Sequence, residues 1–140
     1  MFDDLLVPLL LSKHLGKVKG KTRFQKIVFL IQKEAETRRI QASSFGYEIH
    51  HYGPYSAELS VTLEKLQSDH LLEEETEMTP SGYIRYVYSI TEKGQKLLSD
   101  AQKKGLVSPE LERIIKKVIE EYGEKQLSDL VSDAYGKYLE

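Results

Sequence analysis

Two adjacent histidines and a nearby serine are the residues of this sequence best suited to metal binding or nucleophilic catalysis. Glu48, His50 and His51 precede Ser56 within nine residues of chain. The segment that holds the histidines alternates apolar and polar side chains, as a short strand does, so His50 and His51 are expected to point to opposite faces. The sequence therefore predicts no shared metal site at this pair.

The same segment lacks the other parts of a catalytic site. No acidic residue is placed to orient His51, and no oxyanion signature accompanies Ser56, which a helix cap explains sufficiently. Gly16 and Gly20 stand without the lysine and hydroxyl spacing of a phosphate-binding loop. The absence of cysteine excludes thiolate nucleophiles, disulfides and cysteine-based zinc sites. We expect no enzyme activity, no metal and no cofactor.

Charge is distributed unevenly along a chain whose formal net charge is only -2. Glu34 to Glu77 contains ten acidic residues, whereas Leu5 to Lys33 contains none. The bases of that acid-free stretch are Lys13, Lys17, Lys19, Lys21, Arg23, Lys26 and Lys33. Such a basic region could steer an anionic partner over roughly 8 to 10 Å. A solvated helix end and loop would explain the lysines equally well.

Hydrophobic periodicity predicts the elements of the first half of the chain. A helix is expected from Asp3 to just before Gly16, kinked or delayed by Pro8. Residues 16–20 read as a flexible basic loop, and Thr22 is expected to cap a second, apolar helix. A short strand is predicted for residues 45–50.

The segment Tyr52-Gly53-Pro54-Tyr55-Ser56 predicts a turn that starts a helix. Ser56 would cap this helix, which should run to Asp69. Two strands, residues 71–77 and 83–90, are expected around a turn at residues 79–82. The predicted buried side chains are Leu59, Leu63 and Leu66 on the helix and Ile84, Tyr86, Tyr88 and Ile90 on the second strand.

Three more helices are predicted in the C-terminal part. Thr91 would cap the first, which Gly105 ends, and Ser108-Pro109 is a strong start for the second, which runs to Gly123. The last would span Lys125 to Leu139. We expect residues 1–107 to form one domain and residues 108–140 to be a helical extension, either part of that domain or a dimerisation element.

This order of elements predicts a mainly α fold with a small β-hairpin (α+β): a winged helix-turn-helix with an N-terminal helix and two C-terminal helices. In such folds the helix before the hairpin commonly enters the major groove of DNA, and the hairpin, or wing, touches flanking DNA. The recognition position belongs here to residues 56–69.

Several segments resemble the bacterial and archaeal winged-helix proteins related to the SocA, or Panacea, antitoxin domain. They are KTRFQKIVFLIQKE, FGYEIHHYGPYSAELSVTLEKLQSDHLLEE and YVYSITEKGQKLL, within Lys21 to Leu98. The YGPYS turn followed by Leu-x-x-x-Leu-x-x-Leu is fairly specific to that group, whereas the YSITEKG ending is shared with regulators of the MarR and PadR type. The resemblance implies a winged-helix fold and a role as a transcription regulator or antitoxin.

The predicted recognition helix is poorly supplied with DNA-contacting side chains, because its outward residues include three acids and one base. The first wing strand adds Glu73, Glu74, Glu75 and Glu77, which would repel phosphates. The candidate DNA-binding residues are Lys17, Lys19, Lys21, Arg23, Ser56, Ser60, Lys65 and Arg85.

Two functional hypotheses follow. The first is a dimeric winged-helix protein that binds double-stranded DNA as a transcription regulator or acts like an antitoxin. The second is a protein-protein interaction module that keeps the winged-helix frame, no longer binds DNA and uses its acidic surface to hold a basic partner such as a toxin. A cytoplasmic location is expected, since the apolar segment at the N-terminus is too short for a membrane span and lacks the basic start of a signal peptide.

Overall fold

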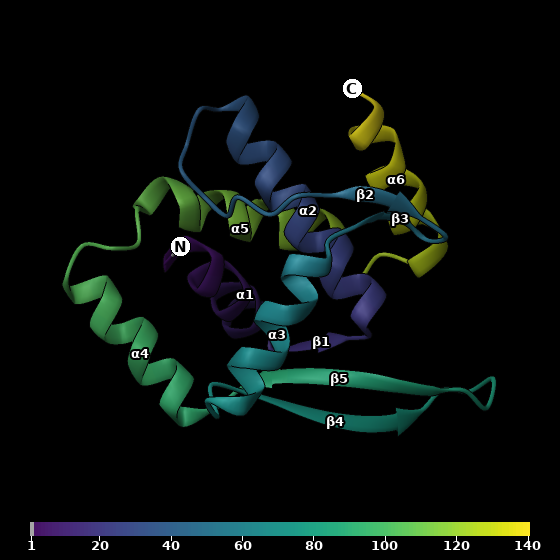
Figure 1. Cartoon of the computed structure of the whole chain (residues 1–140), viewed down its shortest axis with the longest axis horizontal. Helices are drawn as coiled ribbons and strands as arrows, with labels where there is room; N and C mark the ends of the chain where they lie inside the picture. Colours follow the sequence, from purple (N-terminus) through teal and green to yellow (C-terminus); the bar gives the residue numbers. More distant parts are fainter. Residues whose placement is uncertain (1) are drawn as a thin grey trace.

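The computed structural model describes residues 2–140, which form six α-helices and two small antiparallel sheets (Figure 1). The chain is α+β, as the sequence predicted. The helices are α1 (Phe2–Leu15), α2 (Lys21–Thr37), α3 (Ala57–Ser68), α4 (Glu92–Lys103), α5 (Pro109–Tyr122) and α6 (Leu127–Leu139). The strands are β1 (Lys17–Lys19), β2 (Glu48–His50), β3 (Gly53–Tyr55), β4 (Leu72–Met78) and β5 (Ile84–Ile90).

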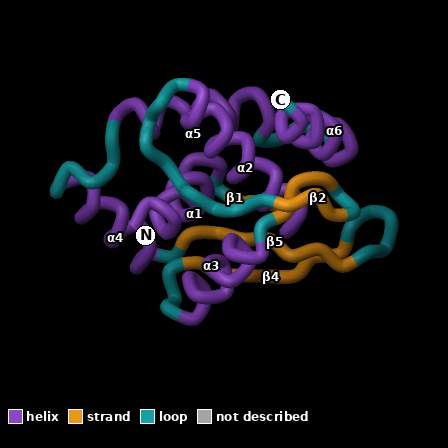
Figure 2. The backbone as a smooth tube through the Cα atoms, turned by 45° about the horizontal axis from the view of Figure 1, so that its top comes forward, coloured by secondary structure: helices purple, strands orange, loops and turns teal. Residues whose placement is uncertain are grey.

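Helix α2 is the centre of the structure and is buried on several sides. It contacts β1, β3 and β5 as well as α1, α5 and α6, and α5 and α6 cover the side of α2 that faces away from the sheet (Figure 2). All six helices contribute to one hydrophobic cluster, including Ile114 and Ile115 from α5 and Leu130 and Ala134 from α6. The apolar stripe of α5 is therefore buried within the chain.

The first strand corrects the predicted loop at residues 16–20. Lys17, Val18 and Lys19 form β1, which pairs antiparallel with β5 and places the buried Val18 opposite Tyr88. The sheet order is β1-β5-β4, so the sheet has one strand more than the expected hairpin. Thr22 does not cap α2. The cap position is Gly20, with φ of 106°, which has no side chain that could cap the first turn.

The β4–β5 hairpin extends beyond the helices that cover its base (Figure 1). Tyr88 is buried, with 1% of its surface exposed, and Ile90 packs against the core. Ile84 lies on the same face but is 67% exposed. The predicted inner face is therefore correct near the base and wrong towards the tip, where Tyr86 is also exposed, because no helix covers that part.

A second hairpin joins α2 to α3. The predicted strand at residues 45–50 is shortened to β2, and the YGPYS turn contains a strand of its own, β3, which pairs with β2. Gly53 has φ of 91°, a backbone conformation that favours glycine. Ser56 caps α3 by accepting a hydrogen bond from the Leu59 amide at 3.1 Å, as predicted.

Helices α4 and α5 begin at the predicted capping residues, whereas α6 begins at Leu127, two residues later than the predicted Lys125. Thr91 accepts a hydrogen bond from the Gly94 amide and Ser108 accepts one from the Leu111 amide, at 2.9 and 3.1 Å. Gly105 has φ of 71° where the chain leaves α4. None of the helices within residues 2–140 combines the length and apolar character needed to cross a lipid bilayer.

Candidate interaction surfaces and cavity

Strand β1 carries the first two candidate DNA-binding residues. Lys17 and Lys19 are exposed and flank the buried Val18. Side chains alternate along a strand, so both lysines lie on the face of the sheet opposite the side occupied by Val18. We call this surface the outer face of the sheet.

The outer face also carries three of the four acids of the first wing strand, Glu73, Glu75 and Glu77, whereas Glu74 lies opposite Tyr88 on the inner face. Across β5, Ser89 pairs with both Lys17 and Glu73, and Val87 pairs with both Lys19 and Glu75. Residues directly opposite each other in an antiparallel sheet point to the same side. The acid-free stretch of sequence therefore does not form a separate basic patch, because a basic edge and an acidic edge share one face.

Arg85 lies on this outer face and is already paired. It stands opposite Glu77 in the strand register, and its Nε atom donates to the Glu77 carboxylate at 2.6 Å. Binding a phosphate through Arg85 would require this ion pair to open. The sequence could not show the pair, because the two residues meet only once the hairpin register is set.

The two bases at the start of α2 differ in accessibility. Lys21 is exposed, and its Nζ atom lies 4.5 Å from the centre of the Tyr86 ring. Arg23 is half-buried and donates to the carbonyl oxygen of Gly123 at 3.4 Å. Burial lowers the pKa of Arg23, and the nearby positive charge of Arg85 adds to the effect. Arg23 therefore has a structural contact that the sequence did not reveal.

The two serine candidates are engaged in the fold. Ser56 is fully buried, and its backbone exchanges two hydrogen bonds with the Gln25 side chain, at 2.8 and 2.9 Å. The Ser60 hydroxyl accepts from Gln25 and bonds the Tyr55 hydroxyl. Ser56 is thus withdrawn from any ligand surface. Of the three candidates in the α3 segment, Ser56, Ser60 and Lys65, only Lys65 is exposed.

The tip of the β4–β5 hairpin, residues 78–84, carries exposed apolar side chains that sequence analysis overlooked. Met78 and Ile84 are directly opposite each other and are 70% and 67% exposed. Tyr83 is also exposed, at 74%. The strand alternation suggested a buried face. The sequence could not show that the hairpin extends beyond the helices that support it and so leaves this end of the face exposed.

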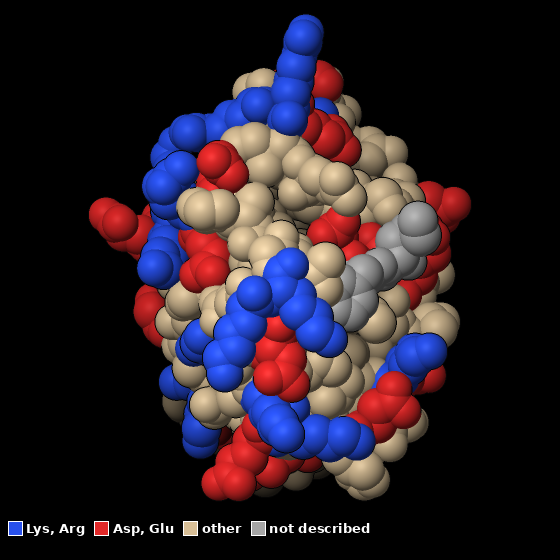
Figure 3. Space-filling view, turned by 90° about the vertical axis from the view of Figure 1, so that its left-hand side faces the viewer, with Lys and Arg blue, Asp and Glu red and all other residues tan. Residues whose placement is uncertain are grey.

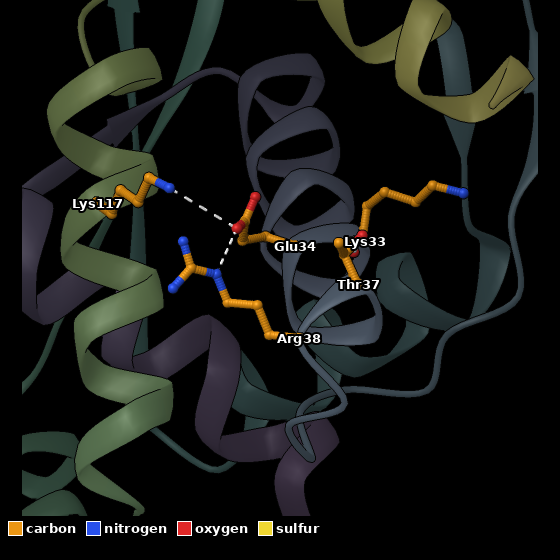
Figure 4. Close-up of polar contacts among 5 residues, drawn as sticks. All are labelled: Lys33, Glu34, Thr37, Arg38 and Lys117. Atoms are coloured by element: carbon orange, nitrogen blue, oxygen red, sulfur yellow. Dashed lines mark hydrogen bonds and ion pairs between the residues drawn. The ribbon is translucent and has the colours of Figure 1, made fainter.

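Charges of both signs are interspersed on the end of the molecule that carries α4 (Figure 3). The acid Glu34, on α2, accepts a hydrogen bond from Arg38 Nε at 2.6 Å and lies 3.8 Å from Lys117 Nζ (Figure 4). The hydrogen bond from Arg38 is the main cause of a lowered pKa at Glu34. Glu34 therefore partly neutralises the charges of Arg38 and Lys117 within the fold. The exposed lysines of α4 are Lys93, Lys96 and Lys103.

A cavity of about 410 Å³ lies between α2, the β2–β3 hairpin, α3 and the sheet. His50 and His51 both line it, against the expectation that they face opposite sides. The reason is local: β2 ends at His50, and His51 lies in the turn, where strand alternation no longer applies. His50 stacks on Tyr55 with ring centres 4.5 Å apart.

Lys26 is a buried wall residue of this cavity. It is 2% exposed, and its Nζ atom donates to the Pro54 carbonyl oxygen at 2.8 Å. Burial lowers its pKa to about 8. The sequence placed Lys26 on the polar side of α2. Its burial could not be predicted there, because the β2–β3 hairpin that covers it comes from a later part of the chain.

The chain is similar to YwgA, an uncharacterised protein of Bacillus subtilis (strain 168), with 34% identity over 87 residues. The aligned region covers 61% of this chain and 48% of YwgA, so the chain spans about half the length of that relative. No family model matches the chain.

Proposed function

We propose that this chain is a protein-binding module of antitoxin type, built on a winged-helix frame. Its partner contacts the hairpin tip and the exposed side of α3, and carries a basic surface with an apolar patch. We prefer the protein-interaction hypothesis to the DNA-binding one because the hairpin and α3 expose acidic and apolar side chains.

The arrangement of elements supports the winged-helix frame. Helix α1, strand β1, helices α2 and α3 and the β4–β5 hairpin follow one another along the chain, and β1 completes a small sheet with the hairpin. In that frame α3 takes the position of the recognition helix and the hairpin that of the wing.

The observation that carries the proposal is the exposed Met78–Ile84 pair at the end of an acidic strand. Exposed apolar side chains that gather at one place mark interaction sites, and methionine and tyrosine are enriched in protein interfaces. Glu73, Glu74 and Glu75 are exposed along the same hairpin. Such a surface would bring carboxylates against the phosphates of DNA, whereas it complements a basic protein.

Helix α3 exposes the same combination of acidic and apolar side chains as the hairpin. Glu58 and Glu64 are exposed on it, and Val61 between them is 64% exposed. An apolar residue flanked by acids repeats the pattern of the hairpin, and Lys65 is the single exposed base of the helix. The resemblance to antitoxin-related proteins agrees with a partner such as a toxin.

Affinity capture from the source cells tests the proposal. We expect one protein to be retained after nuclease treatment, and to be lost with the double substitution Met78→Ser and Ile84→Ser. Leu106→Ser is the matched control, since Leu106 is 48% exposed but lies between α4 and α5. Retention that depends on intact nucleic acid, or that survives the double substitution, contradicts the proposal.

DNA binding is the second candidate, and the exposed lysines of β1 favour it. Lys17 and Lys19 of β1 and Lys21 at the start of α2 lie within five consecutive positions and are exposed. If they hold three phosphates, replacing them with glutamine flattens the slope of log affinity against log salt by about 2.7. Fluorescence anisotropy with duplex DNA measures this slope.

A control with the same loss of charge separates local contact from general attraction. Replacing Lys96, Lys103 and Lys104 of the α4 region removes three exposed lysines without touching β1. The DNA-binding candidate requires the β1 variant to change far more than this control. Absence of duplex binding by the unaltered protein at about 50 mM salt, where phosphate contacts are strong, eliminates it.

A further inference from the structure

We propose that the cavity beside Lys26 binds a small organic carboxylate that carries an aromatic or apolar body. This site shares Glu64 and Glu74 with the proposed docking surface but not the hairpin tip, and it is built from side chains of α2, the β2–β3 hairpin, α3 and the sheet.

The first argument is the incomplete bonding of Lys26. An ammonium group has three donors, and Lys26 Nζ has the Pro54 carbonyl oxygen as its hydrogen-bond acceptor in the described part of the chain. No carboxylate among residues 2–140 pairs with it, although Lys26 is 2% exposed. A buried cation without a counter-charge is costly, so an anion in the cavity would be stabilised there.

A second donor in the cavity wall is also unused. The Nε2 atom of Gln67, on α3, is buried and has no hydrogen-bond partner within residues 2–140. Gln67 lines the same cavity as Lys26. Since buried donors are normally satisfied, a ligand with several acceptor atoms suits this wall better than one with donors.

Gln25, Ser60 and Tyr55 are hydrogen-bonded to one another or to the backbone and keep the wall in place. Gln25 uses its amide nitrogen on Ser56 and Ser60 and its amide oxygen on the Ser56 N–H. The Ser60 hydroxyl also bonds the Tyr55 hydroxyl at 2.8 Å. These bonds join α2, β3 and α3 without using the free donors of Lys26 and Gln67. A rigid wall with unused donors is the form expected of a preorganised polar contact.

The remaining lining suits an apolar body. Tyr52, Leu63 and Tyr88 line the cavity, as do both histidines. Its volume of about 410 Å³ lies in the range of small-molecule sites. Glu64 and Glu74 also line the cavity and would oppose an anion placed next to them, and the exposed Lys21 is a second base of the lining. We place the carboxylate at Lys26, because Lys26 is the buried base.

The experiment uses three probes with the same ring and chain: 3-phenylpropionate, 3-phenylpropanol and 3-phenylpropylamine. They differ in the charge of the end group, and titrations followed by amide chemical shifts of the full chain report both affinity and location. We expect saturable binding of the carboxylate, with shifts centred on the cavity residues, and at least about tenfold weaker binding of the alcohol and the amine.

Two variants identify the groups responsible. Lys26→Met and Gln67→Glu should each weaken the carboxylate by about tenfold or more, while leaving the alcohol nearly unchanged. Lys33→Met is the matched control, because Lys33 lies on the same helix but not at this cavity. Gln67 is half-buried, so Gln67→Glu keeps the test informative if Lys26→Met fails to fold.

Three outcomes would overturn the site. They are the absence of cavity-centred shifts with 3-phenylpropionate, equal binding of the three probes, and carboxylate binding that Gln67→Glu leaves intact. Preference for the amine would show that Glu64 and Glu74, rather than Lys26, control the cavity, and would also refute the proposal. The capture experiment on the hairpin tip uses other residues, so the two proposals fail independently.

Discussion

Ser56 joins helices α2 and α3 through its backbone and side chain. Its hydroxyl caps α3, and its N–H and carbonyl oxygen bond Gln25 of α2. We predict that Ser56→Ala lowers the free energy of unfolding by about 0.5 to 2 kcal/mol, because the Leu59 amide loses its acceptor. Denaturant titration measures the change. Ser68→Ala, at the exposed end of the same helix, should have a much smaller effect, and equal effects would show that the cap contributes little.

Lys26 should make stability depend on pH. Its pKa is lowered from 10.5 to about 8 in the folded state, so the unfolded chain holds this proton more tightly. The cost of folding with a buried charge is full below pH 8, decreases as pH rises and disappears above pH 10.5. We expect Lys26 alone to add up to about 3 kcal/mol of stability across that interval.

The variant Lys26→Met isolates this contribution. It lacks the titrating group, so the difference in unfolding free energy between the unaltered protein and the variant should shift in favour of the unaltered protein between pH 8 and pH 10.5. Chemical denaturation at several pH values provides the comparison. A difference that stays constant across the interval would show that the pKa of Lys26 is not lowered.

Residue roles were predictable from the sequence where they depend on neighbours in the chain. The Ser56 cap needs only the amide three residues later, and Gly53 needs only its own backbone conformation. Arg23 and Lys26 were not predictable in the same way, since their acceptors, the Gly123 and Pro54 carbonyl oxygens, belong to remote segments. A basic residue in sequence is thus a weaker guide to a binding surface than a capping residue is to a helix start.

At the scale of elements, α4 is held close to the sheet by Gly94. A Cβ atom at this position would lie 2.4 Å from the Leu71 carbonyl oxygen and 2.7 Å from Cγ1 of Ile90. We predict that Gly94→Ala lowers the unfolding free energy by about 1 to 3 kcal/mol, because backbone atoms cannot move aside easily. Calorimetry or denaturant titration would measure it.

Gly136 provides the opposite case within another helix. A Cβ atom there would meet nothing within 4 Å, so Gly136→Ala should raise the unfolding free energy by about 0.5 to 1 kcal/mol through the loss of backbone freedom in the unfolded chain. The pair of variants distinguishes close packing from helix propensity. Similar effects at both positions would show that α4 does not approach the sheet as closely as the structure indicates.

Strand β1 shows why the small elements were harder to predict than the helices. The long helices carry apolar residues at a regular spacing over several turns, which identifies them without a partner. Lys17–Lys19 has one apolar residue between two lysines, a pattern that is compatible with a loop until β5 supplies hydrogen bonds. The same dependence on a partner concealed β3 within the YGPYS turn.

At the scale of the whole molecule, the two C-terminal helices complete the core. Leu111, Ile114 and Ile115 of α5 are at most 2% exposed, and Leu130 of α6 is fully buried. We predict that a chain ending at Gly105 is insoluble or unfolded, since this removal exposes the apolar surface of α1 and α2. Sedimentation and circular dichroism test it, and a soluble, cooperatively folded product would contradict the prediction.

A homodimer formed through residues 108–139 stays a prediction. The structure defines which apolar side chains of α6 are available for such an interface. The large apolar side chains of α6 that remain exposed are Leu127, Tyr135 and Leu139, at 42%, 43% and 66%. Replacing all three with serine should convert a dimer formed through them to a monomer without disturbing the core. Sedimentation velocity of this variant beside the unaltered chain measures the effect; a monomeric unaltered chain would refute the dimer.

The divided charge of the outer sheet face has a consequence for solubility. One edge carries Lys17 and Lys19 and the other carries Glu73 and Glu75, so two copies turned head to tail can satisfy each other's charges. Such pairing is weakened by added salt, because exposed charges are screened. The protein should therefore salt in: sodium chloride would raise its solubility and lower its light scattering, whereas association through apolar side chains would be unchanged or strengthened.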